Sequence, residues 1–446
     1  MIHQLFDFIQ CSPTASHTAA TVRAMLVQAG FTELLETDPW SLEPGGKYFT
    51  TRGMSALMAF QVPKGDFHGF SVVAPHGDSP CFKIKENPEL RVDGQYTKLN
   101  TEVYGGTPLA LWIDRPLSVA GRLAVSTEDG VKGVLVDLHR DLLTIPGVAI
   151  HMNRTVNEGV KLDPQKDTLP LLGGSEADLK GLVAQAAGVG PEEILSWDLY
   201  LYSREPGRVF GAQGEFIAAP RLDDLECVFA GTKAFLAANN PENVTVLALF
   251  ENEEIGSLTR QGACSPFLKE VLHRICLSLG RSEEEELRAI AQGFMLSADN
   301  AHAVHPDSPE KSDPTNRCYL NGGVVVKHSP RYASDALTAG VFQAIQLIHG
   351  QQQGAEPCGG GQGDGHQGPL PAGEEADGPQ GLARGLDLDL DAAAQDVAFI
   401  LQLQRGLAAA EELPEGLLEA LVEQPELLGK DVGHLPGDLL DDPLQV

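Results

Sequence analysis

Four apolar segments of this chain stop abruptly, and each is accompanied by side chains that can bind a metal ion. These side chains are His76 and Asp78 in PHGDSP, Asp223 in PRLDDL, Glu253 and Glu254 in ENEE, and Asp299 and His302 in SADNAH. In an open α/β sheet, ligand sites form outside the carboxyl ends of the strands. The pattern therefore favours a sheet whose strand ends build one site.

Strand and helix patterns alternate on both sides of a segment with a different pattern. The runs ALMAFQV (56–62) and GFSVVAP (69–75) predict buried strands, and VTVLALF predicts another after the helix-like segment PRLDDLECVFAGTKAFLAA. Between them, residues 88–215 contain short β-like runs broken by Gly and Pro. We therefore expect an α/β protein with a discontinuous domain, 1–87 and 216–347, whose central mixed sheet is flanked by helices, and an inserted β-rich domain.

The last part of the chain differs in composition from the rest. The net charge is −30, and residues 351–446 carry 3 Lys+Arg against 19 Asp+Glu, with no Ser, Thr, Asn, Met, Tyr or Trp. Such a composition predicts an acidic, Gly/Leu/Asp-rich tail at 348–446 that is partly disordered. The alternative is a segment that does not belong to the fold in front of it, such as an out-of-frame C-terminus.

Charge and cysteine usage limit the partners and the compartment. A strongly acidic chain argues against nucleic acid or an anionic membrane as partner. No apolar run reaches the roughly 18 residues needed to span a bilayer, and the N-terminus lacks the pattern of a signal peptide. The 7 cysteines lack CxxC spacing, which favours a reducing compartment, so we expect a cytoplasmic protein.

The types of side chain at the strand ends favour a metal site. Imidazole nitrogen and carboxylate oxygen suit Zn²⁺, Co²⁺ or Mn²⁺, and an aspartate can bridge two such ions. Of the neighbouring Glu253 and Glu254, one can bind metal while the other remains a general base for a metal-activated water. Singly, each residue has a simpler explanation: a structural histidine, a solvated turn, or a helix N-cap at Asp299. A metal-free glycosidase with paired carboxylates also remains open.

Several longer motifs, in order, resemble one enzyme family. The chain contains APHGDSP, EVYGGTPLALWIDRPLSVAGR, IPGVAIHMNRTVNEG, PRLDDL, NEEIGS, SADNAHAVHP and GGVVVKHSPRYAS. From near residue 5 to about 347 they resemble the M18 metallo-aminopeptidases, which include aspartyl aminopeptidase. The resemblance implies a cytoplasmic enzyme that removes N-terminal residues, acidic ones in the aspartyl branch, from peptide substrates. It also implies two divalent ions, with Zn²⁺ preferred over Co²⁺ or Mn²⁺, and a homo-oligomer formed through a dimerisation domain at 88–215.

The same resemblance implies a role for individual residues. His76, Asp223, Glu254 and Asp299 would bind metal, with Asp223 bridging the two ions. Glu253 would be the catalytic base, and Asp78 would orient His76 from behind. The substrate pocket would be lined by His302, Lys327 and Tyr332, and by His151 reaching in from a neighbouring subunit.

Two departures from the family pattern bear on the metal site. Asp224 stands where the family usually has Asn, which adds a negative charge beside Asp223. The family closes with a Gly-Ser-Thr segment and a motif of the form AMHS, whose histidine is the last metal ligand, and nothing in 348–446 matches either. This leaves an alternative to the active enzyme: an inactive homologue that serves as a binding or assembly module.

Overall fold

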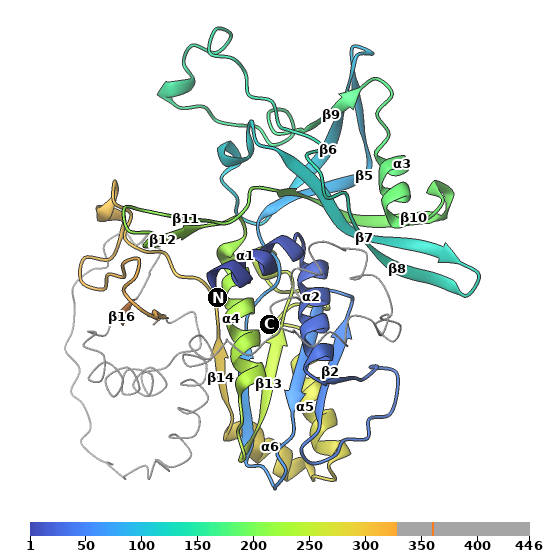
Figure 1. Cartoon of the computed structure of the whole chain (residues 1–446), viewed down its shortest axis with the longest axis vertical. Helices are drawn as coiled ribbons and strands as arrows, with labels where there is room; N and C mark the ends of the chain where they lie inside the picture. Colours follow the sequence, from blue (N-terminus) through green and yellow to red (C-terminus); the bar gives the residue numbers. More distant parts are fainter. Residues whose placement is uncertain (328–358, 361–446) are drawn as a thin grey trace, which may run out of the picture. The chain divides into compact units, whose positions relative to one another are not determined.

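A mixed six-stranded sheet organises one part of the chain, in the strand order β1-β2-β3-β13-β4-β14 (Figure 1). The computed structural model describes residues 1–327 and 359–360, which fall into two compact units, 1–300 and 301 onward. The strands of this first sheet are β1 (Thr32–Glu33), β2 (Lys47–Arg52), β3 (Ala56–Gln61), β13 (Asn243–Leu249), β4 (Gly69–Ala74) and β14 (Phe294–Ser297). The buried strands predicted at 56–62, 69–75 and 244–250 are confirmed within a residue of their ends.

The direction of the strands determines where the loops after them meet. β13 pairs antiparallel with β3 and parallel with β4, and β14 also pairs parallel with β4. The carboxyl ends of β4, β13 and β14 therefore lie at the same edge of the sheet. The predicted α/β class with a central mixed sheet is confirmed.

Helices cover both faces of this sheet (Figure 1). On one face, α5 (Phe267–Ser278) packs apolar side chains such as Phe267 and Ile275 into a core with Phe60 and Val246. Gly231 of α4 lies against Val73 and Leu247 on the opposite face. The remaining helices of this unit are α1 (Ile2–Cys11), α2 (Ala15–Gln28), α3 (Leu179–Ala187), α4 (Leu222–Ala237) and α6 (Glu283–Ala291).

A second six-stranded sheet comes from the middle of the chain and is antiparallel, in the order β8-β7-β10-β5-β6-β9. Its strands are β5 (Cys81–Val92), β6 (Tyr96–Tyr104), β7 (Leu117–Thr127), β8 (Gly130–Asp137), β9 (Leu171–Gly174) and β10 (Ile194–Ser203). A small hairpin follows, β11 (Arg208–Phe210) and β12 (Phe216–Ala218). The division drawn at residue 88 falls inside β5, and the domain boundaries stay a prediction.

The second unit is described over a short length. β15 (Val326–Lys327) pairs parallel with β16 (Gly359–Gly360). Ahead of β15, Gly322 donates its N–H to the carbonyl of Tyr319 and closes a turn. The tail at 348–446 lies outside the described residues, apart from 359–360. Among the described helices, none is long and apolar enough to cross a membrane.

Phe60 offers a test of the core beneath the first sheet. Its ring is fully buried and packs against Trp40 and Tyr48, at centroid distances of 6.0 Å and 5.6 Å. Phe60→Ala should lower the free energy of unfolding by about 3–5 kcal/mol, because it leaves a cavity in close-packed surroundings. Urea denaturation of the full chain measures the change. Leu277→Ala on α5, at a side chain 65% exposed, should change it by less than about 0.5 kcal/mol.

Candidate metal centre

Six of the side chains predicted to form a site come together at the shared edge of the first sheet. His76 and Asp78 follow β4, Asp299 follows β14, and Glu253 and Glu254 form a one-turn helix, η4 (Glu253–Ile255), after β13. Asp223 lies in the first turn of α4, where the backbone departs from helical geometry. The parallel pairing of the strands is what joins residues more than 200 positions apart in the chain.

Two groups of side chains in this cluster have metal-binding geometry. The ligand atoms of His76, Asp223, Asp224 and Asp299 lie within 4.8 Å of one another. The same spacing joins His76 with Glu253 and Glu254. His76 belongs to both groups and therefore connects them, and its side chain is buried.

The protonation of the His76 ring follows from its hydrogen bond. Nδ1 lies 3.1 Å from the backbone carbonyl oxygen of Asp78. Because a carbonyl oxygen only accepts, Nδ1 carries the proton and donates it. Nε2 faces Asp223, whose Oδ1 is 3.5 Å away, and a metal ion that replaces the proton on Nε2 would bind its lone pair. Metal-binding histidines are held in this way, with the second ring nitrogen donating to a carbonyl or carboxylate.

Asp78 holds the two strand ends together. Its buried carboxylate accepts the hydroxyl of Tyr104 at 2.7 Å and the backbone N–H groups of Glu253 and Glu254, each at 3.2 Å. Although burial acts in the opposite direction, hydrogen bonds to His76 and Tyr104 lower the pKa of Asp78. The carboxylate is therefore kept charged, and it fixes the backbone that carries both glutamates.

The charge balance of the cluster favours a cation. Burial raises the pKa of Asp224 to about 7, and burial followed by the charge of Asp223 raises that of Glu254 to about 7. Burial alone would lower the pKa of His76, but hydrogen bonds to Asp223 and Asp78 outweigh it and raise the pKa to about 11. Several carboxylates thus face the single positive charge of the His76 imidazolium. A divalent cation would neutralise their negative charge more completely than this proton does.

The third glutamate of the ENEE motif has a different environment. Glu251 is buried and accepts a hydrogen bond from the hydroxyl of Ser55. Asn252, in a left-handed conformation with φ 65°, turns the chain so that Glu253 and Glu254 face the cluster. Its side-chain amide also donates to the Tyr104 hydroxyl at 2.9 Å. Tyr104 and Asn252 were not predicted as site residues, although both lie in quoted motifs.

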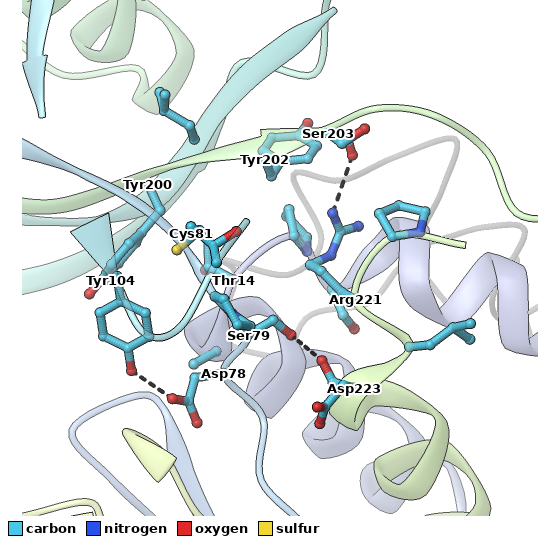
Figure 2. Close-up of a pocket in the computed structure, with 18 of the residues that line it drawn as sticks. Thr14, Asp78, Ser79, Cys81, Tyr104, Tyr200, Tyr202, Ser203, Arg221 and Asp223 are labelled. Atoms are coloured by element: carbon cyan, nitrogen blue, oxygen red, sulfur yellow. Dashed lines mark hydrogen bonds between the residues drawn. The ribbon is translucent and has the colours of Figure 1, made fainter. Parts of the chain in front are cut away.

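A cavity of about 670 Å³ adjoins the cluster (Figure 2). Asp78, Ser79 and Asp223 line it, and the Ser79 hydroxyl donates to the Asp223 carbonyl at 2.8 Å. Arg221 also lines the cavity, and its guanidinium donates to the carbonyls of Ser203 and Ile9. The volume is in the range of small-molecule and cofactor sites, which span roughly 300–1,000 Å³.

None of the predicted substrate-binding residues is among the described residues that line the cavity. His151 is exposed in the long segment between β8 and β9 and is not among the residues that line the cavity. His302 and Lys327 belong to the second unit, where the His302 carbonyl accepts from the Cys318 thiol at 3.1 Å. Tyr332 lies outside the described residues.

The donor set fits a divalent metal ion. One neutral imidazole nitrogen and several carboxylate oxygens are ligands that Zn²⁺, Co²⁺ and Mn²⁺ accept. The buried oxygen Oδ1 of Asp224 has no hydrogen-bond partner among the described residues, and a buried carboxylate of this kind is better satisfied beside a cation. The described residues therefore fit the group that the sequence motifs imply.

The chain is similar to known proteins. The family model described as aminopeptidase I zinc metalloprotease (M18) matches residues 8–363. A probable M18 family aminopeptidase 2 of Clostridium novyi (strain NT) is 44% identical over 355 residues, covering 77% of this chain and 82% of the relative. Its counterpart in Clostridium acetobutylicum is 44% identical over 359 residues, covering 78% and 83%.

Solved structures are also similar. The cryo-EM structure of the Ape4 and Nbr1 complex has a TM-score of 0.76 and 27% identity, covering 97% of this chain and 88% of that chain. The structure of the S. cerevisiae mApe1 dodecamer has a TM-score of 0.69 and 26% identity, covering 81% and 89%.

The Tyr104 hydroxyl can be tested as a support of the cluster. Tyr104→Phe should lower the free energy of unfolding by about 1–3 kcal/mol, because it removes one hydrogen bond from each of the buried Asp78 and Asn252. Urea denaturation measures the change against Tyr96→Phe, whose ring is 55% exposed. Equal effects of the two substitutions would contradict the prediction.

Proposed function

The chain belongs to the M18 family of zinc metallo-aminopeptidases, and we propose that it removes N-terminal residues, acidic ones by preference, from peptides at the centre built around His76. One observation carries this proposal: the side chains assigned to the family's site converge at one sheet edge and share His76. The adjoining cavity, which has Asp78 and Asp223 in its wall, is of a size to hold the end of a peptide.

His76, Asp223, Glu254 and Asp299 would hold two divalent ions, with Zn²⁺ preferred. When bound, the ions supply Lewis-acid polarisation of the scissile carbonyl and lower the pKa of a water molecule. The protein positions its ligands in advance, because the carbonyl of Asp78 fixes the ring of His76 and its carboxylate fixes the backbone N–H of Glu254.

Glu253 would be the general base. Its side chain is about half exposed, and its Oε2 lies 3.9 Å from Nε2 of His76, so a water molecule can reach it beside the metal ligands. Partial burial raises its pKa, which makes the carboxylate a better proton acceptor. Glu253 would take the proton from the attacking water and return it to the leaving amine. Asp78, which accepts the N–H of Glu253, positions it for this transfer.

The preference for acidic residues rests on cationic side chains. Arg221 lines the cavity, and a guanidinium favours a carboxylate by charge and by hydrogen-bond geometry. His302, Lys327 and Tyr332 would complete the substrate pocket. His151 would come from a neighbouring subunit of a homo-oligomer assembled through residues 88–215. The dodecamer of the similar S. cerevisiae protein supports this assembly, and we propose that the enzyme works in the cytoplasm.

A second candidate function is favoured by one specific feature of the sequence. The family's closing histidine motif has no counterpart in residues 348–446, so one ligand of the second ion is missing from the pattern. The second candidate is a homologue that binds metal without turnover and serves as a binding or assembly module. Turnover by the purified chain distinguishes the two.

Glu253→Gln tests the proposed base. The amide keeps the size of the side chain but does not accept a proton, so kcat/KM for peptide hydrolysis should fall by at least about 10²-fold to 10⁴-fold. Metal content, measured by mass spectrometry, should stay unchanged. Glu284→Gln, on the exposed first turn of α6, is the control and should keep the rate. An unchanged rate for Glu253→Gln would refute the assignment, and metal binding without turnover in the parent chain would favour the second candidate.

A matched pair of substrates tests the preference for acidic residues. Peptides that begin with Asp or with Asn have nearly the same shape and differ in charge. We expect kcat/KM for the Asp peptide to be higher by about 10-fold, which corresponds to about 1.4 kcal/mol of differential binding in the transition state. Raising the ionic strength should lower the ratio of kcat/KM for the Asp peptide to that for the Asn peptide, because salt screens the interaction between charges. A preference for the Asn peptide would contradict the proposal.

A further inference from the structure

Asp224 is the most deeply buried carboxylate of the cluster. Its side chain has no solvent exposure, whereas that of the neighbouring Asp223 is 50% exposed. Oδ2 of Asp224 accepts the backbone N–H of His76 at 3.1 Å and lies 4.0 Å from Nε2 of the same residue. Asp224 therefore points into the same space as the lone pair of His76.

One oxygen of this carboxylate lacks a hydrogen-bond partner. The Cys227 thiol hydrogen-bonds to the carboxylate group, whereas Oδ1 of Asp224 accepts no hydrogen bond among the described residues. Within the same described part, no lysine or arginine forms an ion pair with it. A buried carboxylate with an unsatisfied oxygen is costly unless a cation completes its surroundings. The unpaired oxygen, together with the 4.0 Å between Oδ2 of Asp224 and Nε2 of His76, supports a ligand role for Asp224.

We propose that Asp224 is the fourth protein ligand of a metal ion held by His76, Asp223 and Asp299. This inference rests on the proposed metal centre and adds to it a ligand that the family resemblance does not supply. The four ligand atoms lie within 4.8 Å of one another. Tetrahedral coordination at bond lengths of about 2.0 Å needs separations of roughly 3.3 Å. Asp223 and Asp299 are exposed and can close this difference, while His76 and Asp224 are held by the fold.

The proposed ligand set bears on the closing histidine motif of the family, which has no counterpart in residues 348–446. A site with four protein ligands, all within residues 76–299, needs no ligand from the tail. One ion is therefore bound tightly by this chain even though the closing motif of the family is absent. Because four protein ligands leave a tetrahedral ion no open position, activation of water beside Glu253 would fall to the second ion, at Glu254, and this is the ion that depends on further ligands.

A purely positioning role for Asp224 makes a different prediction. If the side chain only accepts the N–H of His76, an asparagine oxygen serves equally well, and Asn is the usual residue of the family here. A ligand role requires the negative charge and the orphaned oxygen. Asp224→Asn separates the two roles without changing the size of the side chain.

The experiment uses the full chain, stripped of metal and loaded with one equivalent of Co²⁺. Visible absorption reports the ligands of the ion, and competition with a chelator gives the dissociation constant. Asp224→Asn should change the absorption spectrum and weaken binding more than 100-fold. Asp78→Asn, which alters a positioning residue, is the control and should weaken binding about 10–100-fold with the spectrum unchanged. An unchanged spectrum in Asp224→Asn would overturn the proposal.

A second measurement does not depend on the variants folding. In a crystal structure of the parent chain with one Zn²⁺, an Asp224 oxygen about 2.0–2.2 Å from the ion supports the proposal. A separation beyond about 3 Å overturns it. If only this inference is wrong, the parent chain still binds metal and hydrolyses peptides. If the proposed function is wrong, the parent chain does neither.

Discussion

The buried carboxylate of Asp78 is the interaction on which the site depends. It contacts His76 from the end of β4, the backbone of Glu253 and Glu254 after β13, and the hydroxyl of Tyr104 at the end of β6. A single charged group thus joins both sheets of the unit at 1–300. Burial is the largest single effect and opposes the ionised form, but the hydrogen bonds and the charge of His76 together outweigh it and keep the carboxylate charged. A neutral side chain of the same shape would lack the negative charge that these hydrogen bonds stabilise.

Some side chains of the cluster are buried and held by hydrogen bonds, and others are partly exposed to solvent. His76, Asp78 and Asp224 are buried and hydrogen-bonded to the backbone or to one another, whereas Asp223 and Glu253 are about half exposed. This asymmetry suits a centre that must hold an ion in fixed geometry and still admit water and a peptide. It also links metal binding to folding, since an ion bound to the native state stabilises it by mass action. Without an ion, the carboxylates repel one another and compete for the proton of His76.

Sequence patterns predicted the strands and the helices next to the site because they are local. β3, β4 and β13 are continuous apolar runs, as expected for strands buried on both faces, and the helix-like segment PRLDDLECVFAGTKAFLAA contains α4. The motifs around His76, Glu253 and Asp299 identified the family. Several long motifs in the same order are a specific signal, whereas one short pattern is not.

By itself, the sequence determined the type of fold, the family and the kinds of side chain at the strand ends. Only the tertiary structure decided which neighbouring carboxylate faces the cluster and which faces away. Glu251 and Glu253 are two residues apart, yet one binds Ser55 in the interior and the other faces His76. Likewise, only the fold buries Asp224 with one oxygen unpaired and brings Tyr104 to Asp78. The physical reason is that burial and partners are set by strand order and loop path between distant segments, which periodicity along the chain does not record.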